Sequence, residues 1–193
     1  MKLLHLDSSI QAEASASRQL TRAIVSRWQA EHPGIEVVYR DLAAEGLAHL
    51  SGAALARHDE LEAARNDAVL QEFLDADVVV VGAPLYNFSI PSQLKAWIDR
   101  IVVAGKTFRY TQTGPQGLAG GKQLIVAVTR GGVYDAGARA EFGESYLRFL
   151  FGFLGVEDVT FVRAEGLKLS PQHRADALAA AHAAIQVRPL RAA

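Results

Sequence analysis

Serine side chains cluster in a segment that joins a predicted strand to a predicted helix. Residues 8–17 (SSIQAEASAS) contain four serines and no glycine. Hydroxyl groups and the free backbone N–H groups of a helix start can bind a phosphate. The segment matches neither GxxxxGK[ST] nor GxGxxG, so it indicates a phosphate monoester and no nucleoside triphosphate or dinucleotide. The alternative is that these serines only cap a helix, with Ser17 as the N-cap.

Two further segments have residue types that suit a planar ligand. In residues 84–91 (PLYNFSIP), Tyr86 and Phe88 flank Asn87. Aromatic rings stack on flat molecules, and an amide hydrogen-bonds to their edges; alternatively, both rings belong to the periphery of the core. In residues 129–132 (TRGG), the paired glycines allow the backbone to approach a ligand closely, or they simply form a turn.

The chain alternates between strand and helix patterns along its length. Strands are predicted at residues 2–7, 35–40, 77–83, 123–129 and 157–164, and helices at 17–32, 58–75, 92–105, 139–155 and from 171 onward. Residues 106–122 are predicted to be irregular. Five strands separated by helices predict a parallel sheet with helices on both faces. Such a sheet binds ligands beyond the carboxyl ends of its strands, where the three segments would meet.

Together the three segments fit a planar heterocycle with a phosphorylated tail, such as flavin mononucleotide (FMN). The predicted architecture is α/β, a flavodoxin-like three-layer sandwich with a five-stranded parallel sheet in the order 2-1-3-4-5. No linker or repeat interrupts the pattern, so residues 1–193 are predicted to form one domain. Asp7 closes the first strand beside the phosphate segment, and a carboxylate there is expected to turn away from the phosphate.

Composition excludes several classes of function. The chain has 193 residues and a formal net charge of −1, so no positive field attracts nucleic acid or anionic lipid. It contains no cysteine, which excludes thiol catalysis and is compatible with a cytoplasmic location. No apolar stretch approaches the roughly 20 residues that cross a membrane, and none reads as a signal peptide. No HExxH or GxSxG motif is present, so neither a metal site nor a hydrolase is predicted.

Several strings in the sequence occur in the order found in a known family. They are residues 7–9 (DSS), 15–17 (SAS), 83–88 (APLYNF), 107–111 (TFRYT), 114–118 (GPQGL), 129–132 (TRGG), 151–155 (FGFLG) and 164–166 (AEG). Through them the chain resembles the FMN-dependent NADH azoreductases, also called FMN-dependent NADH:quinone oxidoreductases, over nearly its whole length. Leu85 stands where the family usually has Met, and residues 48–67, which border the substrate pocket in the family, look short.

The resemblance implies a role for each motif. The residues that would hold the FMN phosphate are Ser9, Ser15, Ala16 and Ser17; those against the isoalloxazine ring are Leu85, Tyr86, Asn87 and Phe88; and those at its pyrimidine edge are Thr129, Arg130, Gly131 and Gly132. Asn87, Phe88 and Tyr110 would line the pocket for the second substrate. No side chain is implied as a nucleophile or general base, since the flavin N5 carries the hydride.

The resemblance also implies the reaction and the assembly. NADH would donate two electrons, and quinones or aromatic azo compounds would accept them in a ping-pong cycle through one pocket. The family is homodimeric, which would give residues 106–122 and the apolar residues 149–154 a partner to contact. Two alternatives stay open, a flavodoxin-like electron carrier and a flavin-sensing regulatory module, neither of which would turn over NADH.

Overall fold

The computed structural model describes residues 1–134 and 142–189, and in them five parallel strands form a central sheet. The strands are β1 (Lys2–Asp7), β2 (Glu36–Asp41), β3 (Val78–Pro84), β6 (Gln123–Thr129) and β7 (Asp158–Ala164). Their order is β2-β1-β3-β6-β7. The predicted parallel sheet and its order are confirmed, because these are the five predicted strands in the order 2-1-3-4-5.

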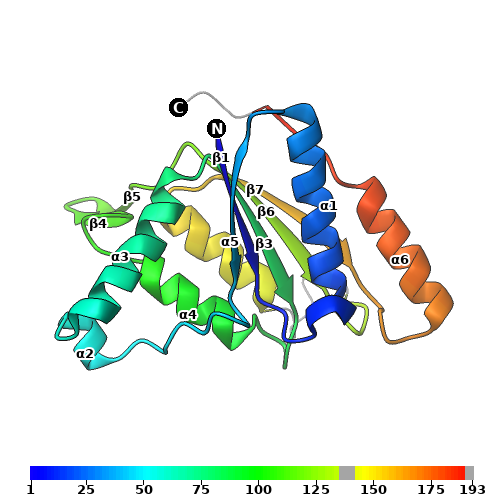
Figure 1. Ribbon diagram of the computed structural model, residues 1–193, viewed down its shortest axis with the longest axis horizontal. Coiled ribbons are helices and arrows are strands. Elements are labelled where there is room, and N and C mark those ends of the chain that lie inside the picture. Colours follow the sequence, from blue (N-terminus) through cyan, green and yellow to red (C-terminus); the bar gives the residue numbers. More distant parts are fainter. Residues whose placement is uncertain (135–141, 190–193) are drawn as a thin grey trace.

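The valines of β3 explain why this strand lies at the centre of the sheet. Every residue of β3 is buried. Val79 and Val81 pack on the face covered by α3 (Glu60–Asp75), α4 (Ser92–Ile101) and α5 (Gly143–Phe153). Val78 and Val80 pack on the face covered by α1 (Ala16–Glu31) and α6 (Pro171–Ala183). Successive side chains of a strand point to opposite faces, so one run of valines serves both cores. Figure 1 shows the resulting three layers.

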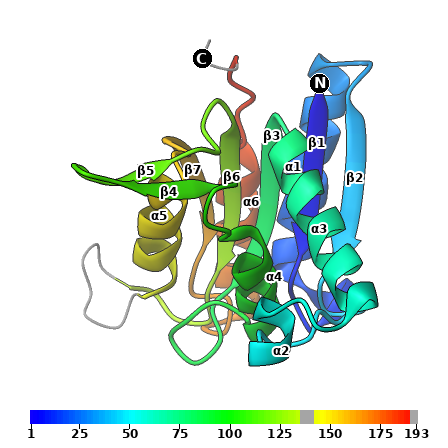
Figure 2. The same cartoon turned by 90° about the vertical axis from the view of Figure 1, so that its left-hand side faces the viewer.

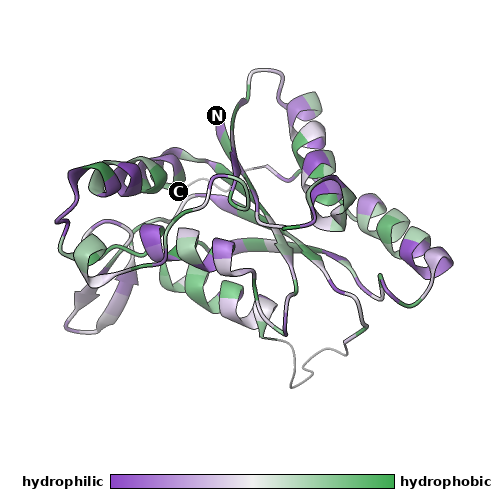
Figure 3. Ribbon diagram, turned by 60° about the horizontal axis from the view of Figure 1, so that its bottom comes forward, coloured by the Kyte–Doolittle hydropathy of each residue, from purple (hydrophilic) through white to green (hydrophobic). Residues whose placement is uncertain are grey.

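The helices contribute apolar stripes that match the two faces of the sheet. In α4, Leu94, Trp97, Ile98 and Ile101 are buried at spacings of three and four, which places them on one side of a helix. Phe73 of α3 meets Trp97 edge-on, with ring centroids 5.8 Å apart. In Figure 3 the hydrophobic colour follows the central strands, and the helices alternate between hydrophobic and hydrophilic residues.

Some predicted boundaries are wrong, and local hydrogen bonds give the reason. The helix expected at 17–32 begins at Ala16, with Ser15 rather than Ser17 as its N-cap, because Ser15 Oγ accepts from the Arg18 N–H at 3.3 Å. The helix expected to reach residue 105 ends at Ile101, whose carbonyl accepts from Thr107 Oγ1 at 2.6 Å. Residues 139–141, the start of the helix expected at 139–155, lie outside the described residues.

The other differences are smaller. The strand expected at 35–40 lies one residue later, and the helix expected at 58–75 begins at Glu60 after an Asp59 N-cap. Two short helices, η1 (Ala12–Ala14) and α2 (Gly52–Leu55), precede α1 and α3. No helix in the described parts of the chain combines the length and apolar character needed to cross a membrane.

Residues 106–122 are not irregular, contrary to the prediction. They form an antiparallel hairpin of β4 (Phe108–Thr111) and β5 (Gly114–Gly117) that extends away from the body (Figure 2). Phe108 anchors its base against Phe153 of α5, with ring centroids 4.7 Å apart. Glycine and proline occupy most of β5, so the hydrophobic alternation that identifies a strand is absent from the sequence.

Candidate functional site

A cavity of about 180 Å³ opens beyond the carboxyl ends of β1, β3, β6 and β7. Its lining residues are Gln11, Ser15, Ala16, Pro84, Leu85, Tyr86, Thr129, Arg130, Gly131, Leu167, Lys168 and Arg174. The three segments singled out in the sequence therefore meet around one space. Sequence reasoning missed its fourth wall, residues 167–174. The signal was available, because this segment follows the fifth predicted strand at the same edge of the sheet.

The start of α1 contributes Ser15 and Ala16 to the lining of this cavity, and Ser17 contacts Ser15 without being part of the lining. Ser15 and Ser17 are both buried, and their Oγ atoms are 3.0 Å apart. Ser15 also caps the helix. A helix N-terminus carries unpaired N–H groups and the positive end of the helix dipole, so this combination suits a phosphate oxygen.

Tyr86 connects residues 8–17, the segment predicted to bind phosphate, to the loop after β3. Its hydroxyl lies 3.1 Å from Ser9 Oγ and accepts from the Ile10 N–H at 3.3 Å. Ser9 Oγ also accepts from the Gln11 N–H at 3.2 Å, and Ser9 is buried. Ser9 therefore stands behind the cavity wall, where its contacts hold the two loops together. Its assignment to the phosphate stays a prediction.

The loop after β3 contains a strained turn. Tyr86 and Ser89 exchange both backbone hydrogen bonds, at 2.9 and 3.0 Å. The two residues between them have positive φ, 49° at Asn87 and 67° at Phe88. A turn of this kind prefers Asn followed by Gly, and a bulky residue with positive φ costs free energy. Phe88 is nevertheless 54% exposed, so the turn presents an aromatic ring to solvent at the edge of the site.

The segment after β6 faces the cavity mainly with its backbone. The carbonyls of Gly131 and Gly132 accept from the N–H groups of Lys168 and Gly166, and the Arg130 N–H donates to the Ala164 carbonyl at 3.0 Å. Among the described residues, the N–H groups of Gly131 and Gly132 are therefore the donors that this segment can offer to a ligand. The Arg130 guanidinium is buried and forms ion pairs with Glu144 at 2.6 Å and Glu165 at 2.7 Å. Its charge is therefore compensated within the protein. Recognition by this segment is expected to depend on N–H groups rather than on the arginine charge.

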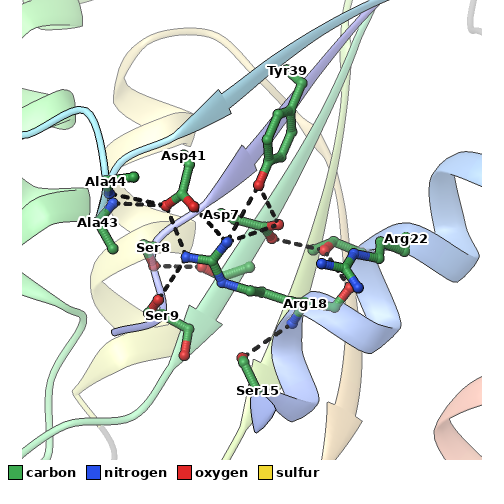
Figure 4. A network of polar contacts seen from close by, with 12 residues as sticks. Asp7, Ser8, Ser9, Ser15, Arg18, Arg22, Tyr39, Asp41, Ala43 and Ala44 are labelled. Atoms are coloured by element: carbon green, nitrogen blue, oxygen red, sulfur yellow. Dashed lines mark hydrogen bonds and ion pairs between the residues drawn. The ribbon is translucent and has the colours of Figure 1, made fainter. Parts of the chain in front are cut away.

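A partly buried polar network contacts residues 8–17, the segment predicted to bind phosphate (Figure 4). Arg18 donates to both carboxylate oxygens of Asp41, at 2.6 and 2.8 Å, and to the Ser9 carbonyl at 2.8 Å. Asp7 accepts from the Thr21 hydroxyl at 2.8 Å and from the Tyr39 hydroxyl at 3.2 Å. The Asp7 carboxylate thus binds these hydroxyls, in agreement with the expectation that it turns away from the phosphate site.

The network also shifts the acidity of its members. Burial alone would raise the pKa of Asp7, but His5 at 3.5 Å, the Thr21 hydroxyl and the Arg18 charge outweigh burial and lower the pKa below its usual value. Partial burial and the carboxylates of Asp7 and Asp41 raise the pKa of Tyr39 to about 12. At neutral pH, Asp7 is therefore ionised and Tyr39 is a neutral donor.

Two features lie apart from this site. Tyr110, a predicted pocket residue, is on the hairpin, which leaves the body near the opposite end of the sheet (Figure 2). A larger cavity of about 590 Å³ lies between the loop after β2, α3 and α4. Two of the arginines that line it are already paired, Arg40 with Glu72 and Arg100 with Glu62. The smaller cavity is the candidate site because all three ligand-type segments converge on it.

Comparison with known proteins agrees with this fold and site. The model of a family described as having the flavodoxin-like fold matches residues 1–188. The chain therefore belongs to this family, and the predicted flavodoxin-like architecture is confirmed. Within the family, its relatives include proteins named FMN-dependent NADH:quinone oxidoreductase, so the resemblance seen in the sequence motifs is also confirmed.

The relatives and the solved structures cover nearly the whole chain. The FMN-dependent NADH:quinone oxidoreductase of Xanthomonas oryzae pv. oryzae (strain KACC10331 / KXO85) is 60% identical over 186 residues, 96% of this chain and 95% of the relative. The protein of that name from Stenotrophomonas maltophilia (strain K279a) is 56% identical over 185 residues, 96% of this chain and 94% of the relative. Azoreductase from Bacillus anthracis str. Sterne has a TM-score of 0.85 at 33% identity, with 95% of each chain covered. An FMN-dependent NADH-azoreductase from Bacillus anthracis str. Ames Ancestor, solved in complex with FMN, has a TM-score of 0.87 at 26% identity, also with 95% of each chain covered.

Proposed function

We propose that this protein is an FMN-dependent NADH:quinone oxidoreductase that also cleaves aromatic azo compounds to amines. The observation that carries the proposal is that one cavity is lined by the start of α1, by residues 84–86 at the entry to the strained turn, and by residues 129–131 after β6. The relatives that bear this name and the FMN complex of a structural neighbour support it.

The residues of the cavity fit the parts of FMN. Ser15, Ala16 and Ser17 would hold the phosphate, and Ser9 would support them from behind. Leu85 and Tyr86, which line the cavity, would pack against the isoalloxazine ring, together with Asn87 and Phe88 of the adjoining turn. The N–H groups of Gly131 and Gly132 would donate hydrogen bonds to its pyrimidine edge. When bound, FMN supplies two-electron redox chemistry. The protein binds and orients the ring, excludes water, and stabilises negative charge on the reduced ring with backbone N–H groups.

The overall reaction balances in electrons and protons. NADH and one proton reduce a quinone to a hydroquinone and leave NAD⁺. An azo bond requires two NADH and two protons to give two amines. The nicotinamide of NADH and the acceptor are both flat, so each could stack in turn on the exposed Phe88 ring. Because the two substrates would use one pocket alternately, we propose ping-pong kinetics. We also propose a cytoplasmic location, where NADH is available.

We further propose that the enzyme works as a homodimer. Tyr110 on the hairpin is 77% exposed and Phe149 on α5 is 75% exposed. Exposed large apolar side chains on neighbouring elements are typical of a surface that another chain covers. Tyr110 would then reach the pocket of the second copy rather than that of its own chain.

Steady-state kinetics test the proposed function. Purified protein should have the visible absorbance of a flavin, and it should oxidise NADH with a soluble quinone and with an azo dye. Initial rates at several concentrations of both substrates should give parallel double-reciprocal lines, as expected for a ping-pong mechanism. An electron carrier or a flavin sensor would bind FMN but consume almost no NADH, and that result would contradict the proposal.

A further inference from the structure

We propose that Lys168 and Arg174 form a cationic wall that binds the phosphate of FMN and selects FMN over unphosphorylated flavin. The inference rests on the proposed function, since it assigns these residues to the same cofactor. Neither residue belongs to the serine segment that identifies the phosphate site in the sequence. Both line the cavity that contains Ser15 and Ala16 at the start of α1.

Backbone pairing brings Lys168 to the cavity. Residues 166–168 continue beyond β7 and pair with residues 130–132: the Leu167 N–H donates to the Arg130 carbonyl at 3.1 Å, and the Lys168 N–H donates to the Gly131 carbonyl at 3.0 Å. A β-carbon on Gly131 would lie 3.1 Å from Lys168 Cδ. The missing side chain at Gly131 therefore leaves room for the lysine stem along the cavity wall.

The position of Arg174 is unfavourable unless an anion is near. Arg174 lies at the N-terminal end of α6, and the first turn of this helix contains no acidic residue. The positive end of the helix dipole destabilises a cation at that position. In the described residues, neither Arg174 nor Lys168 has an ion pair or a side-chain hydrogen bond, whereas Arg18 and Arg130 pair with carboxylates. Two unpaired cations that share one cavity repel each other, and a bound anion would relieve this repulsion.

The chemistry of the ligand supplies that anion. A phosphate monoester carries between one and two negative charges near neutral pH. Ser15, Ser17 and the backbone of α1 provide hydrogen bonds and the partial charge of a helix dipole, but no full positive charge. Lys168 and Arg174 provide two. Riboflavin has the same ring as FMN and lacks the phosphate, so the two cations should contribute to the binding of FMN and leave the binding of riboflavin unaffected.

Flavin affinity measured on the flavin-free protein tests this inference. Quenching of flavin fluorescence gives the Kd of FMN and of riboflavin for wild type, Lys168→Gln, Arg174→Gln and the double variant. We expect each single substitution to weaken FMN binding roughly five- to tenfold and to change riboflavin binding less than about twofold. FMN binding by wild type should weaken as salt increases, and the double variant should lose most of that dependence.

Arg27→Gln is the matched control, because it removes the same charge from an exposed side chain on the last turns of α1. Its ratio of FMN to riboflavin affinity should equal that of wild type. Equal ratios in wild type and in the double variant would overturn the inference, and so would a wild type that binds riboflavin as tightly as FMN. NADH turnover by wild type tests the proposed function separately, because it is measured without either variant.

Discussion

Phe88 is the residue at which local backbone preference and the site disagree most. Its φ of 67° is typical of glycine, and its ring is exposed. Positive φ at a bulky residue costs on the order of 1–3 kcal/mol and persists at positions that serve a function. The pattern of residues 84–91 indicated an aromatic contact surface. Only the backbone angles show that the fold loses stability in order to present it.

Substitution of Phe88 by Gly separates these two effects. We expect Phe88→Gly to raise the free energy of unfolding by about 1 kcal/mol, because glycine adopts positive φ without strain. The same change removes the ring, so KM for the quinone should rise. Chemical denaturation and steady-state kinetics measure the two quantities, and Phe88→Ala, which keeps the strain without the ring, is the control. A less stable Phe88→Gly protein, or one with an unaltered KM, would contradict this interpretation.

At the scale of elements, one arginine of α1 joins two strands to the phosphate segment. Arg18 binds Asp41 at the end of β2, lies 4.0 Å from Asp7 at the end of β1, and holds the Ser9 carbonyl. These contacts need an ionised Asp41 and an ionised Asp7, and the pKa of each is lowered in the folded protein. The geometry of the candidate site should therefore depend on carboxylates that the cavity itself does not contain.

The contacts between Arg18 and these carboxylates predict how acid changes the free energy of unfolding. A carboxyl group whose pKa is lowered by folding stabilises the protein above its unfolded pKa, near 3.8 for Asp, and this contribution is lost as the pH falls towards the folded pKa. The unfolding free energy of wild type should fall across that window, and Asp7→Asn should be less stable at neutral pH with a flatter dependence. Denaturation at several pH values measures both. Asp176→Asn, at an exposed position of α6, is the control. Parallel curves for wild type and Asp7→Asn would refute the prediction.

At the scale of the whole molecule, Gly117 of the hairpin packs against the backbone of Leu154 and Gly155, directly after α5, with no space between them. A β-carbon on Gly117 would lie 2.2 Å from the Gly155 nitrogen and 2.3 Å from the Leu154 carbonyl carbon. Backbone cannot yield as the end of a flexible side chain can, so any side chain at Gly117 must displace the hairpin. The hairpin carries Tyr110, so its position would decide which face meets the second copy in the proposed homodimer.

Gly117→Ala accordingly tests the proposed homodimer. The added methyl group should cost about 1–3 kcal/mol of stability and move the hairpin, so the dimer should dissociate at higher protein concentration than wild type. Sedimentation velocity over a dilution series measures this shift. Gly34→Ala, where an added β-carbon meets nothing within 4 Å, should behave as wild type. A wild-type protein that is monomeric at all concentrations would contradict the proposed assembly.

Much of the fold follows from the sequence because its signals are local. Two local patterns indicate which surfaces are buried: the valine run Val78–Val81 and the helical spacing of Leu94, Trp97 and Ile101. A strand that is buried on both of its faces is typical of a parallel sheet with helices on both sides. The strings around Ser15, Tyr86 and Gly131 indicated a ligand because each follows a strand at the same edge. The hairpin was not predicted, because β4 and β5 are stabilised by pairing with each other and by contact with α5, and the sequence of β5 contains no hydrophobic alternation.

The sequence by itself determined the alternation of strands and helices, the three ligand-type segments and the family, because these depend on residue type and spacing along the chain. The strand order was expected from the flavodoxin-like fold, and the structure confirmed it. Only the tertiary structure decided that Arg130 is neutralised by Glu144 and Glu165, that Ser9 lies behind Tyr86, and that residues 167–174 complete the cavity. The physical reason is that charge compensation and cavity walls depend on distances between residues far apart in the chain, and no local pattern encodes such distances.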